Sequence, residues 1–401
     1  MRVARIYDLG DVRIEQQPVP TLQPGDALVR MAVCGICTSD TFPWYVRRKA
    51  PAVLGHDPTG TIVQTDSSLF DVGDRIFIHH HAPCMTCRHC QREEYSMCPT
   101  WRSSAIDPGG LAEYVRVPAH NLAHDCFRLP DEMSFEDGAL IEPVACAVQA
   151  LRRKCRLKSG DRVLILGAGM MGQILIRVAH HYGASILIAA DRVPYRLDKA
   201  IEMGADHAID VSKDDLSSAV KERTDGDGAD LVVVCPGSID AMTSGLQCVG
   251  PGGTVCLFTP SESRERLPIS PYDFWFNHIT LTTSYSCGPS DTREAADLIS
   301  KGAVTADQIV THRYFLDQVV TAIAEVGLKR LTIYPGSYNT YLTEREARLT
   351  RLREQKSRQD EEVARIRTFI DRFRYKSTKA AQVQSRVKML EKITPIEVPA
   401  E

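Results

Sequence analysis

The residues that most constrain the fold of this chain form one run, 161–192, with the sequence DRVLILGAGMMGQILIRVAHHYGASILIAADR. An apolar stretch comes first, followed by a glycine-rich turn, a stretch with helical period and a second apolar stretch. Strands joined by a helix in this way lie parallel in one sheet, because the helix crosses back over the sheet face. Further apolar runs at 229–238, 252–260 and 279–286 continue the pattern. The sequence therefore predicts a doubly wound, parallel α/β sheet.

The turn GAGMMG has a spacing that is typical of dinucleotide sites. Gly167 permits the tight turn, Gly169 lets a pyrophosphate approach the backbone, and Gly172 lets the helix pack close to the strand. The amino end of the helix then faces the phosphates. The candidate cofactor-binding residues are Gly167, Gly169, Met170, Met171, Gly172, Asp191, Arg192 and Arg196.

Asp191 indicates which dinucleotide would bind, because it lies 24 residues after Gly167 at the end of the second apolar run. A carboxylate at this place bonds the ribose hydroxyls and repels a 2′-phosphate, which favours NAD over NADP. The neighbouring Arg192 would suit a 2′-phosphate and keeps NADP open as the alternative.

Four of the 13 cysteines stand together in CMTCRHCQREEYSMC, at the spacing C-x2-C-x2-C-x7-C. Cys84, Cys87, Cys90 and Cys98 can surround one tetrahedral Zn²⁺, and four thiolates leave no open position, so this site would be structural. An iron–sulfur cluster or free thiols are the alternatives. The three histidines at 79–81 follow an apolar run, and we interpret them as a strand end rather than as metal ligands.

A second, open metal site is indicated by three short motifs that lie apart in the chain. CGICTSD contains Cys37, GHDPTG contains His56 and Asp57, and LIEPVACAVQA contains Glu142. A catalytic zinc takes three protein ligands and keeps one exchangeable position. Cys37 and His56 with either Glu142 or Asp57 would complete that set, and Cys146 is a rival third ligand.

The composition and the lack of long apolar segments argue against a secreted or membrane-spanning protein. The 401 residues are 43% hydrophobic and 25% charged, as in ordinary globular proteins with room for two or three domains. The N-terminus MRVARIYDLG lacks the apolar core of a signal peptide, and no uncharged stretch is long enough to span a bilayer. We therefore expect a cytoplasmic protein without membrane contact, in which cysteines serve metal or catalysis before disulfides.

In this order, the motifs resemble those of zinc-dependent medium-chain alcohol dehydrogenases over residues 1 to about 335. The similarity rests on CGICTSD, GHDPTG, the four-cysteine lobe, GGLAEYV, EPVAC and the nucleotide fingerprint, and it is greatest to the sorbitol (L-iditol) and threonine dehydrogenase branch. The resemblance implies a GroES-like β-barrel catalytic domain, residues 1–145 completed by 289–336. A Rossmann NAD-binding domain, residues 146–288, is inserted into it.

The resemblance also implies site residues. The implied catalytic zinc ligands are Cys37, His56 and Glu142, with Asp57 as an alternate or second-shell carboxylate. Ser39 would lie in the proton path and Asp40 would orient His56. The implied cofactors are two zinc ions per chain and NAD, the implied reaction is hydride transfer from an alcohol to the nicotinamide, and a homo-oligomer is expected.

Two positions depart from the family pattern. Asp57 stands where the family usually has the longer Glu, so direct ligation by Asp57 is in doubt. Phe42 stands where many relatives carry a His that completes the proton relay, and we expect protons to leave through water or the cofactor ribose instead.

The substrate is less constrained than the reaction. The aromatic candidates for the substrate site are Phe42, Trp44, Tyr45 and Trp101, and Arg47, Arg48 or Arg102 would suit a substrate carboxylate. A polyol or similar secondary alcohol is the favoured substrate, with an L-threonine-type activity as the alternative. An NADP-linked reductase is disfavoured, because the metal set argues against zinc-free reductases and Asp191 argues against NADP.

Residues 337–401 differ from the rest of the chain. Apolar residues recur there at steps of three and four in two stretches, which predicts an antiparallel helical hairpin, a coiled coil. Residues 338–401 hold 15 Lys and Arg against 10 Asp and Glu, within a chain of net charge −3. The basic residues at the predicted tip are Arg372, Arg374, Lys376 and Lys379.

The stretch FIDRFRYKSTKAAQVQSRVKMLEKI resembles the inter-domain linker of ABC-F-type ATPases, a family whose hairpin reaches into the ribosome. The chain has no G-x-x-x-x-G-K-[ST] loop, so ATP hydrolysis is not implied. A competing hypothesis is therefore an RNA- or ribosome-binding fusion protein with an inert or regulatory dehydrogenase part. The complete zinc and nucleotide sets favour the enzyme, and we expect the tail to take no part in its chemistry.

Overall fold

The computed structural model describes residues 1–8, 11–318, 322–327 and 330–335, together with isolated residues and short helical stretches between 350 and 386. The chain divides into two compact units, which are treated separately below. The first contains residues 1–9 and 14–314, and the second contains residues 10–13 and 315–401. The candidate site residues all belong to the first unit.

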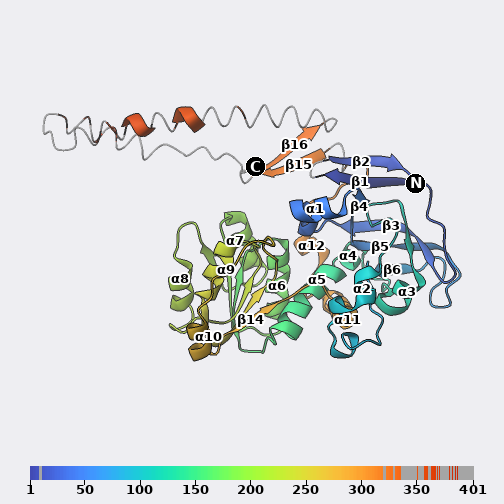
Figure 1. Ribbon diagram of the computed structural model, residues 1–401, viewed down its shortest axis with the longest axis horizontal. Helices are drawn as coiled ribbons and strands as arrows, with labels where there is room; N and C mark the ends of the chain where they lie inside the picture. Colours follow the sequence, from blue (N-terminus) through green and yellow to red (C-terminus); the bar gives the residue numbers. More distant parts are fainter. Residues whose placement is uncertain are drawn as a thin grey trace. The chain divides into compact units, whose positions relative to one another are not determined.

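The predicted parallel sheet is present, with six strands in the order β11-β10-β9-β12-β13-β14. Figure 1 shows this part of the molecule, with β14 among the helices labelled α6 to α10. The strands are β9 (Arg162–Leu166), β10 (Ile186–Asp191), β11 (His207–Asp210), β12 (Ala229–Val234), β13 (Val249–Leu257) and β14 (Thr280–Thr283). All neighbouring strands run parallel. The strand order reverses between β9 and β12, and in open α/β sheets the ligand site lies at the carboxyl ends of the strands beside such a reversal.

Helices cover both faces of this sheet. They are α6 (Met170–His181), α7 (Pro194–Glu202), α8 (Leu216–Glu222), α9 (Ile239–Leu246) and α10 (Pro271–Asn277). Val163 and Ile165 of β9 lie in one apolar core with α6, whereas Leu164 and Leu166 lie in a second core with α8 and α9. Since successive strand residues point to opposite faces, burial on both faces explains the uninterrupted apolar run in the sequence. The Rossmann-type prediction is confirmed.

The N-terminal part is antiparallel and corresponds to the predicted GroES-like domain. Its five-stranded sheet, in the order β7-β3-β5-β6-β8, contains β3 (Ala27–Gly35), β5 (Asp57–Thr65), β6 (Arg75–Ile78), β7 (Tyr114–Val117) and β8 (Cys126–Arg128). A three-stranded sheet contains β1 (Arg2–Asp8), β2 (Asp11–Gln16) and β4 (Ala52–Val53). The short helices are η1 (Thr38–Thr41), α1 (Pro43–Lys49), η2 (Cys90–Arg92), η3 (Tyr95–Met97), α2 (Pro99–Ser103), α3 (Ala119–Asp125) and α4 (Phe135–Ala139).

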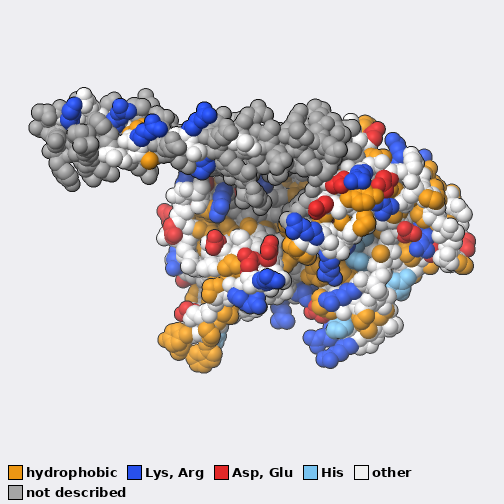
Figure 2. All heavy atoms as spheres, turned by 45° about the horizontal axis from the view of Figure 1, so that its top comes forward, with side chains coloured by type: hydrophobic (Ala, Val, Ile, Leu, Met, Phe, Trp, Pro, Cys, Tyr) orange, Lys and Arg blue, Asp and Glu red, His pale blue; other side chains and the backbone are white. Residues whose placement is uncertain are grey.

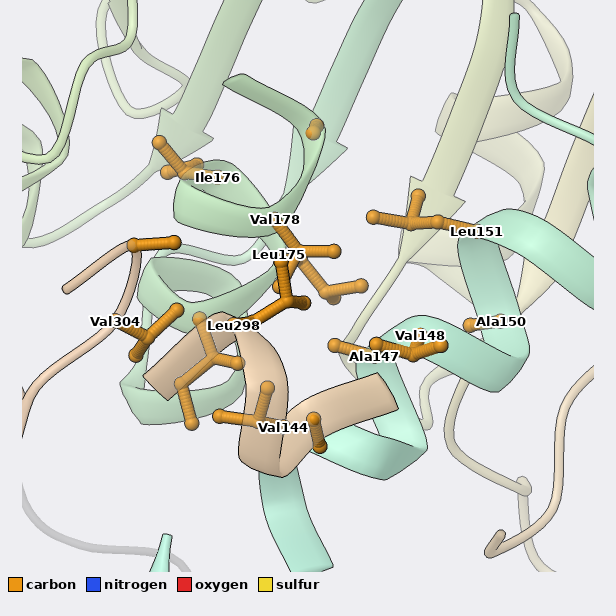
Figure 3. Packing of buried hydrophobic residues seen from close by; sticks show 14 of the residues in the cluster. Val144, Ala147, Val148, Ala150, Leu151, Leu175, Ile176, Val178, Leu298 and Val304 are labelled. Atoms are coloured by element: carbon orange, nitrogen blue, oxygen red, sulfur yellow. The ribbon is translucent and has the colours of Figure 1, made fainter. Parts of the chain in front are cut away.

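The two parts share one apolar core. The segment α5 (Ile141–Val148) and η4 (Gln149–Lys154) leads from the first part into the second, and α11 (Pro289–Ser300) and α12 (Ala306–Ile309) follow the parallel sheet. In Figure 3, side chains of α5, α6 and α11 meet, among them Val144, Leu175 and Leu298. Fully burying one such aliphatic side chain contributes about 1.5–3 kcal/mol. This core therefore fixes α5 relative to the glycine-rich turn that precedes α6.

The second unit is described only in part. β15 (Ala322–Gly327) and β16 (Arg330–Pro335) pair in antiparallel register. The helical hairpin predicted for residues 337–401 lies almost entirely outside the described residues. Across the part of the chain that the structure describes, no helix combines the length and the apolar character needed to cross a membrane.

Candidate active site

The four-cysteine lobe brings its sulfur atoms together. The Sγ atoms of Cys87 and Cys90 are 3.6 Å apart, those of Cys84 and Cys98 are 3.6 Å apart, and those of Cys84 and Cys90 are 3.9 Å apart. A tetrahedron with Zn–S bonds of about 2.3 Å has S···S edges of about 3.8 Å. The four side chains therefore fit a zinc ion, and the contacts leave no room between the sulfurs for an iron–sulfur cluster.

Hydrogen bonds favour the thiolate form at Cys84 and Cys98, whereas burial and the neighbouring cysteines raise the pKa of Cys90 to about 12. The backbone N–H of Cys87 donates to Cys84 Sγ at 3.3 Å, and that of Cys84 donates to Cys98 Sγ at 3.4 Å. Hydrogen bonds from Thr86, helped by the Cys87 amide, lower the pKa of Cys84 to about 5. Zinc binds the thiolate form of cysteine. The backbone N–H groups of this short segment therefore help its own cysteines to bind the ion.

The residues predicted for the open site come from separate loops. Cys37 immediately precedes η1, and the Ser39 hydroxyl donates to Cys37 Sγ at 3.3 Å. His56 immediately precedes β5. Burial lowers its pKa, but the Asp57 carboxylate, a hydrogen bond with Cys37 and further carboxylates hold it well above its usual value. Asp40 Oδ1 lies 3.7 Å from His56 Nδ1, so Asp40 contacts His56 as an ion pair rather than at hydrogen-bond distance.

Two carboxylates meet at the same place. Asp57 begins β5, Glu142 lies in the first turn of α5, and both side chains are buried and close enough for each carboxyl to affect the other. Burial raises the pKa of Asp57 well above its usual value, despite the nearby His56. Among the described residues, neither oxygen of Asp40 nor Oδ1 of Asp57 has a hydrogen-bond partner.

Buried carboxylates without partners are costly, and a divalent cation would compensate their charge. A thiol, an imidazole and carboxylates are also the donors that zinc accepts. Cys37, His56, Asp57 and Glu142 offer such donors and lie near one another, and their joint ligation of a zinc ion stays a prediction. Among the described residues, the ligand atoms at this place that lie within 4.8 Å of one another are those of His79, Glu142 and Cys287, so His79, interpreted from the sequence as no ligand, belongs to a group that could hold a metal.

Of the side chains that surround Glu142, the sequence indicated Cys146 but neither Cys287 nor Asp125. Cys146 Sγ donates to Glu142 Oε1 at 3.3 Å, which places the rival ligand Cys146 against Glu142. Cys287 Sγ lies 3.9 Å from the same Oε1 and 3.8 Å from His79 Nε2. Asp125 Oδ2 accepts from His79 Nδ1 at 2.5 Å. Neither Cys287 nor Asp125 belongs to a local motif, so no sequence signal marks them.

The three histidines that follow β6 have different surroundings. His79 faces Asp125 and Cys287, whereas His81 Nδ1 contacts the Ser104 carbonyl. The His80 ring lies between them, with its centroid 5.1 Å from that of His56. Burial and the neighbouring His81 lower the pKa of His80 well below its usual value. The strand-end interpretation holds for the backbone, since β6 ends at Ile78, but the side chains border the open site.

The glycine-rich turn has the shape that a pyrophosphate requires. Gly167 has φ +95°, a left-handed conformation that favours glycine, and a Cβ on Gly172 would lie 2.1 Å from the Gly167 carbonyl oxygen. A Cβ on Gly169 would meet nothing closer than Arg196 Nη1 at 4.0 Å, which leaves open space beside the backbone. Met170 and Met171 begin α6 next to this space.

Asp191 ends β10 and braces the turn. Its Oδ2 accepts from the Ala168 amide at 2.9 Å, and its Oδ1 accepts from the amides of Arg192 at 2.7 Å and Val193 at 2.9 Å. Arg196 Nη1 lies 3.5 Å from Asp191 Oδ2. The predicted cofactor residues therefore come together at the carboxyl ends of β9 and β10.

One predicted substrate residue has another role. The Arg102 guanidinium donates to the Ser96 carbonyl at 3.0 Å and contacts Met97 Sδ, so it braces the four-cysteine lobe.

Three of the aromatic substrate candidates pack against one another. Phe42 and Trp44 stack with ring centroids 6.1 Å apart, and Trp44 meets Tyr45 edge-on.

Comparison with known proteins agrees with this geometry. Sorbitol dehydrogenase of Mus musculus is 31% identical over 341 residues, which cover 81% of this chain and 93% of the relative. Probable D-xylulose reductase A of Aspergillus clavatus is 30% identical over 339 residues, covering 80% and 93%.

Solved structures show the same fold. Alcohol dehydrogenase TADH from Thermus sp. ATN1 superimposes with a TM-score of 0.72 at 27% identity, covering 80% of this chain and 94% of that one. The 2R,3R-butanediol dehydrogenase from Bacillus subtilis gives a TM-score of 0.70 at 27% identity, covering 79% and 93%.

Family profiles divide the chain in the same way. An alcohol dehydrogenase GroES-like domain matches residues 23–131, and a zinc-binding dehydrogenase domain matches residues 171–301. A profile described as ABC transporter matches residues 324–401. From its fold, its ligand clusters and its relatives, we conclude that this chain belongs to the zinc-binding alcohol dehydrogenase family.

Proposed function

We propose that this chain is an NAD-dependent zinc dehydrogenase that oxidises a secondary alcohol of the polyol class. The observation that carries the proposal is the convergence of Cys37, His56, Asp57 and Glu142, beside carboxylate oxygens that lack partners in the described chain. Relatives named for sorbitol, D-xylulose and butanediol support a polyhydroxy substrate.

Each residue then has a defined task. Cys37 and His56, with Glu142 or Asp57, hold the zinc, which when bound supplies the Lewis acidity that lowers the pKa of a substrate hydroxyl. Ser39 accepts the released proton and passes it to water, because Phe42 offers no imidazole for a relay. The rigid core around α5 and α6 keeps Glu142 at a fixed place relative to the dinucleotide turn, which favours a reactive geometry.

NAD is the proposed dinucleotide. Asp191 places a negative charge where a 2′-phosphate would lie, and three backbone amides hold it there. Among similar structures, a zinc-binding dehydrogenase from Sinorhizobium meliloti is bound to NADP, and a protein from Escherichia coli described as a short chain alcohol dehydrogenase is complexed with NADH, so both dinucleotides occur in comparable folds. The ratio of kcat/KM for NAD and NADP tests the choice, and a preference for NADP would contradict it.

The function is tested by following NADH formation with sorbitol, xylitol, inositol, threonine, 2,3-butanediol and simple secondary alcohols, with and without a zinc chelator. Chelator-sensitive turnover of a polyol is the expected result. Turnover of threonine alone would favour the threonine-type alternative. A protein that binds zinc and NAD but oxidises none of these alcohols would contradict the proposed substrate class.

A homo-oligomer is also proposed. Helix α10 exposes Tyr272 (69%), Trp275 (72%) and Phe276 (59%), and Figure 2 shows hydrophobic side chains gathered at its lower left, the end where Figure 1 places α10. The helix precedes β14, which ends the six-stranded order. Contiguous exposed apolar surface of this kind marks interaction sites. Tyr272→Ser combined with Trp275→Ser should shift the protein to monomers in sedimentation, and an unchanged mass would contradict this role.

Residues 337–401 are proposed to take no part in the oxidation. The zinc and dinucleotide clusters lie within residues 37–287 and need nothing from the C-terminal segment. Removal of residues 338–401 should leave kcat/KM unchanged. Salt-sensitive RNA binding that disappears with this removal would instead support the RNA- or ribosome-binding hypothesis.

A further inference from the structure

Glu142 is surrounded by a second group of potential metal ligands, in addition to those predicted for the open site. Cys287 Sγ lies 3.9 Å from Glu142 Oε1 and 3.8 Å from His79 Nε2. All three donor atoms lie within 4.8 Å of one another, and all three side chains are buried. They come from α5 and from the loops that follow β6 and β14, so tertiary packing alone brings them together.

The spacing of the three atoms fits a single ion. A tetrahedral zinc ion has Zn–S bonds of about 2.3 Å and Zn–N or Zn–O bonds of about 2.0–2.2 Å, so a sulfur and a nitrogen or oxygen ligand lie about 3.6 Å apart. The distances from Cys287 Sγ, 3.8 and 3.9 Å, are only slightly longer. A thiol is a weak hydrogen-bond donor, so hydrogen bonding gives little reason for this arrangement.

The His79 ring is held in the way that metal-binding histidines are held. Asp125 Oδ2 accepts from His79 Nδ1 at 2.5 Å, and Asp125 Oδ1 accepts from the Thr292 hydroxyl at 2.6 Å. A carboxylate on one ring nitrogen fixes the tautomer and the ring orientation, and the other nitrogen is then available as a ligand. That other nitrogen, Nε2, is the atom that faces Cys287.

The charge of the cluster also favours a cation. Glu142 and Asp125 are buried, and among the described residues neither carboxylate has an ion pair with a lysine or an arginine. Cys146 Sγ, 3.3 Å from Glu142 Oε1, adds a second thiol that would supply a fourth ligand. Buried carboxylates without a cationic partner are costly, and a divalent cation would compensate their charge.

We propose that His79, Glu142 and Cys287 form a metal site in their own right, an inner position for the zinc ion of the open site. Glu142 belongs to both ligand sets, so one ion lies either at the inner position or at Cys37 and His56. With the second thiol as fourth ligand, the inner position has no place for a substrate, and an ion there is stored rather than catalytic. The inference rests on the proposed zinc-dependent function and deepens it, because it adds two ligands that the proposed site does not contain.

The test counts metal ions in variants of the full-length protein. Cys37→Ser removes a ligand of the outer position only, so this variant should keep about two zinc ions per chain, one in the four-cysteine lobe and one at the inner position. Cys37→Ser combined with Cys287→Ser should keep about one, because both positions have then lost a ligand. Zinc content after dialysis, measured by atomic absorption, checks both expectations.

A matched control separates the loss of this particular thiol from the loss of any buried thiol. Cys248 is 1% exposed, and its Sγ donates to the Ser244 carbonyl, a hydrogen bond that a serine can keep. Cys37→Ser combined with Cys248→Ser should therefore hold about two ions, as Cys37→Ser alone does. His79→Gln, which keeps a donor for Asp125, replaces Cys287→Ser if that variant does not fold, and it should also lose one ion.

Cobalt(II) gives a spectroscopic readout that does not depend on activity. Sites that accept zinc also accept cobalt(II), and a thiolate ligand gives this ion an intense near-ultraviolet absorption. Cobalt that binds to Cys37→Ser with its lobe zinc in place should show this absorption, because Cys287 supplies the thiolate. The combined Cys37→Ser and Cys287→Ser variant should show neither uptake nor absorption.

The possible results separate the inner position from the proposed function. A Cys37→Ser protein that keeps only the lobe zinc overturns the inner position, and so does a combined Cys37→Ser and Cys287→Ser protein that still holds both ions. Either result leaves the dehydrogenase function standing where the wild-type protein shows chelator-sensitive oxidation of an alcohol. A wild-type protein that holds only the lobe zinc and oxidises no alcohol overturns the proposed function, and the inner position falls with it.

Discussion

The four-cysteine lobe and the open site use similar ligand chemistry but are built in opposite ways. The lobe takes its four ligands from 15 consecutive residues, and local amides donate to its sulfurs. The proposed open site would draw Cys37, His56, Asp57 and Glu142 from three segments, and carboxylate oxygens of Asp40 and Asp57 have no hydrogen-bond partner among the described residues. The first arrangement favours a permanently bound ion that stabilises the fold. The second keeps unsatisfied groups where a reaction is to occur, at a cost in stability.

The largest effect should come from the open site. Cys37→Ser removes a soft ligand there, and we expect kcat/KM to fall at least about 10³-fold, since metal polarisation of the substrate is worth several kcal/mol. The melting temperature should change little. Steady-state kinetics and calorimetry on the same preparation check both parts, and a large drop in melting temperature would show that the open site also carries the fold.

The matched substitution in the lobe should do the reverse. Cys98→Ser removes one of four ligands, and we expect the free energy of unfolding to fall by about 3 kcal/mol or more, because structural zinc binding contributes directly to folding. Denaturant unfolding with zinc quantification measures this. If Cys98→Ser kept its stability and lost only activity, the division of roles between the two sites would be wrong.

A smaller effect, on zinc affinity, is expected from Asp125, which holds His79 close to Glu142. Asp125→Asn weakens the hold on His79, which lies against Cys287 and within reach of Glu142. Removing such a supporting carboxylate typically costs roughly 10- to 100-fold in metal affinity or activity. Competition with a chelating dye measures the zinc affinity of the open site. Unchanged affinity in Asp125→Asn would restrict Asp125 to a packing role.

The smallest predicted effect is a change of stability with pH, and it comes from Asp291 of α11. Burial raises the pKa of Asp291 to about 6, although the Gly288 amide and Arg153 act in the opposite direction. The unfolded carboxyl has a pKa of about 3.9, so as the pH rises from 4 to 6 the unfolded chain loses its proton first. The stability contributed by Asp291 is thus complete below pH 4 and lost as the pH passes 6.

This loss should amount to about 2 kcal/mol between pH 4 and 7. Urea unfolding across this range checks it, with Asp291→Asn as the comparison, whose curve should lack this decline. Parallel curves for the two proteins would mean that Arg153, 3.3 Å from Asp291 Oδ1, keeps the carboxylate ionised throughout.

The same contrast explains what could be predicted from the sequence. The parallel sheet, the glycine-rich turn and the four-cysteine lobe are local patterns, and the structure contains them. Cys37, His56 and either Glu142 or Asp57 were predicted from residue types in three separate motifs, and the family resemblance selected Glu142 as the third ligand. Cys287 and Asp125 reach Glu142 and His79 through tertiary packing across 145 and 46 residues of sequence, so no spacing could indicate them. The lack of a hydrogen-bond partner for His80 Nδ1 among the described residues depends on its surroundings in the fold, so the run HHH could not indicate it.

The central claim is that two different zinc sites divide stability and catalysis between them, and graded chelation tests it most directly. The purified chain should contain about two zinc ions. Mild chelation should remove one ion, abolish NAD reduction and leave the melting temperature nearly unchanged, whereas removal of the second ion should unfold the protein. Loss of activity and of fold together with the first ion would contradict the division, and so would a fully active protein that binds a single zinc.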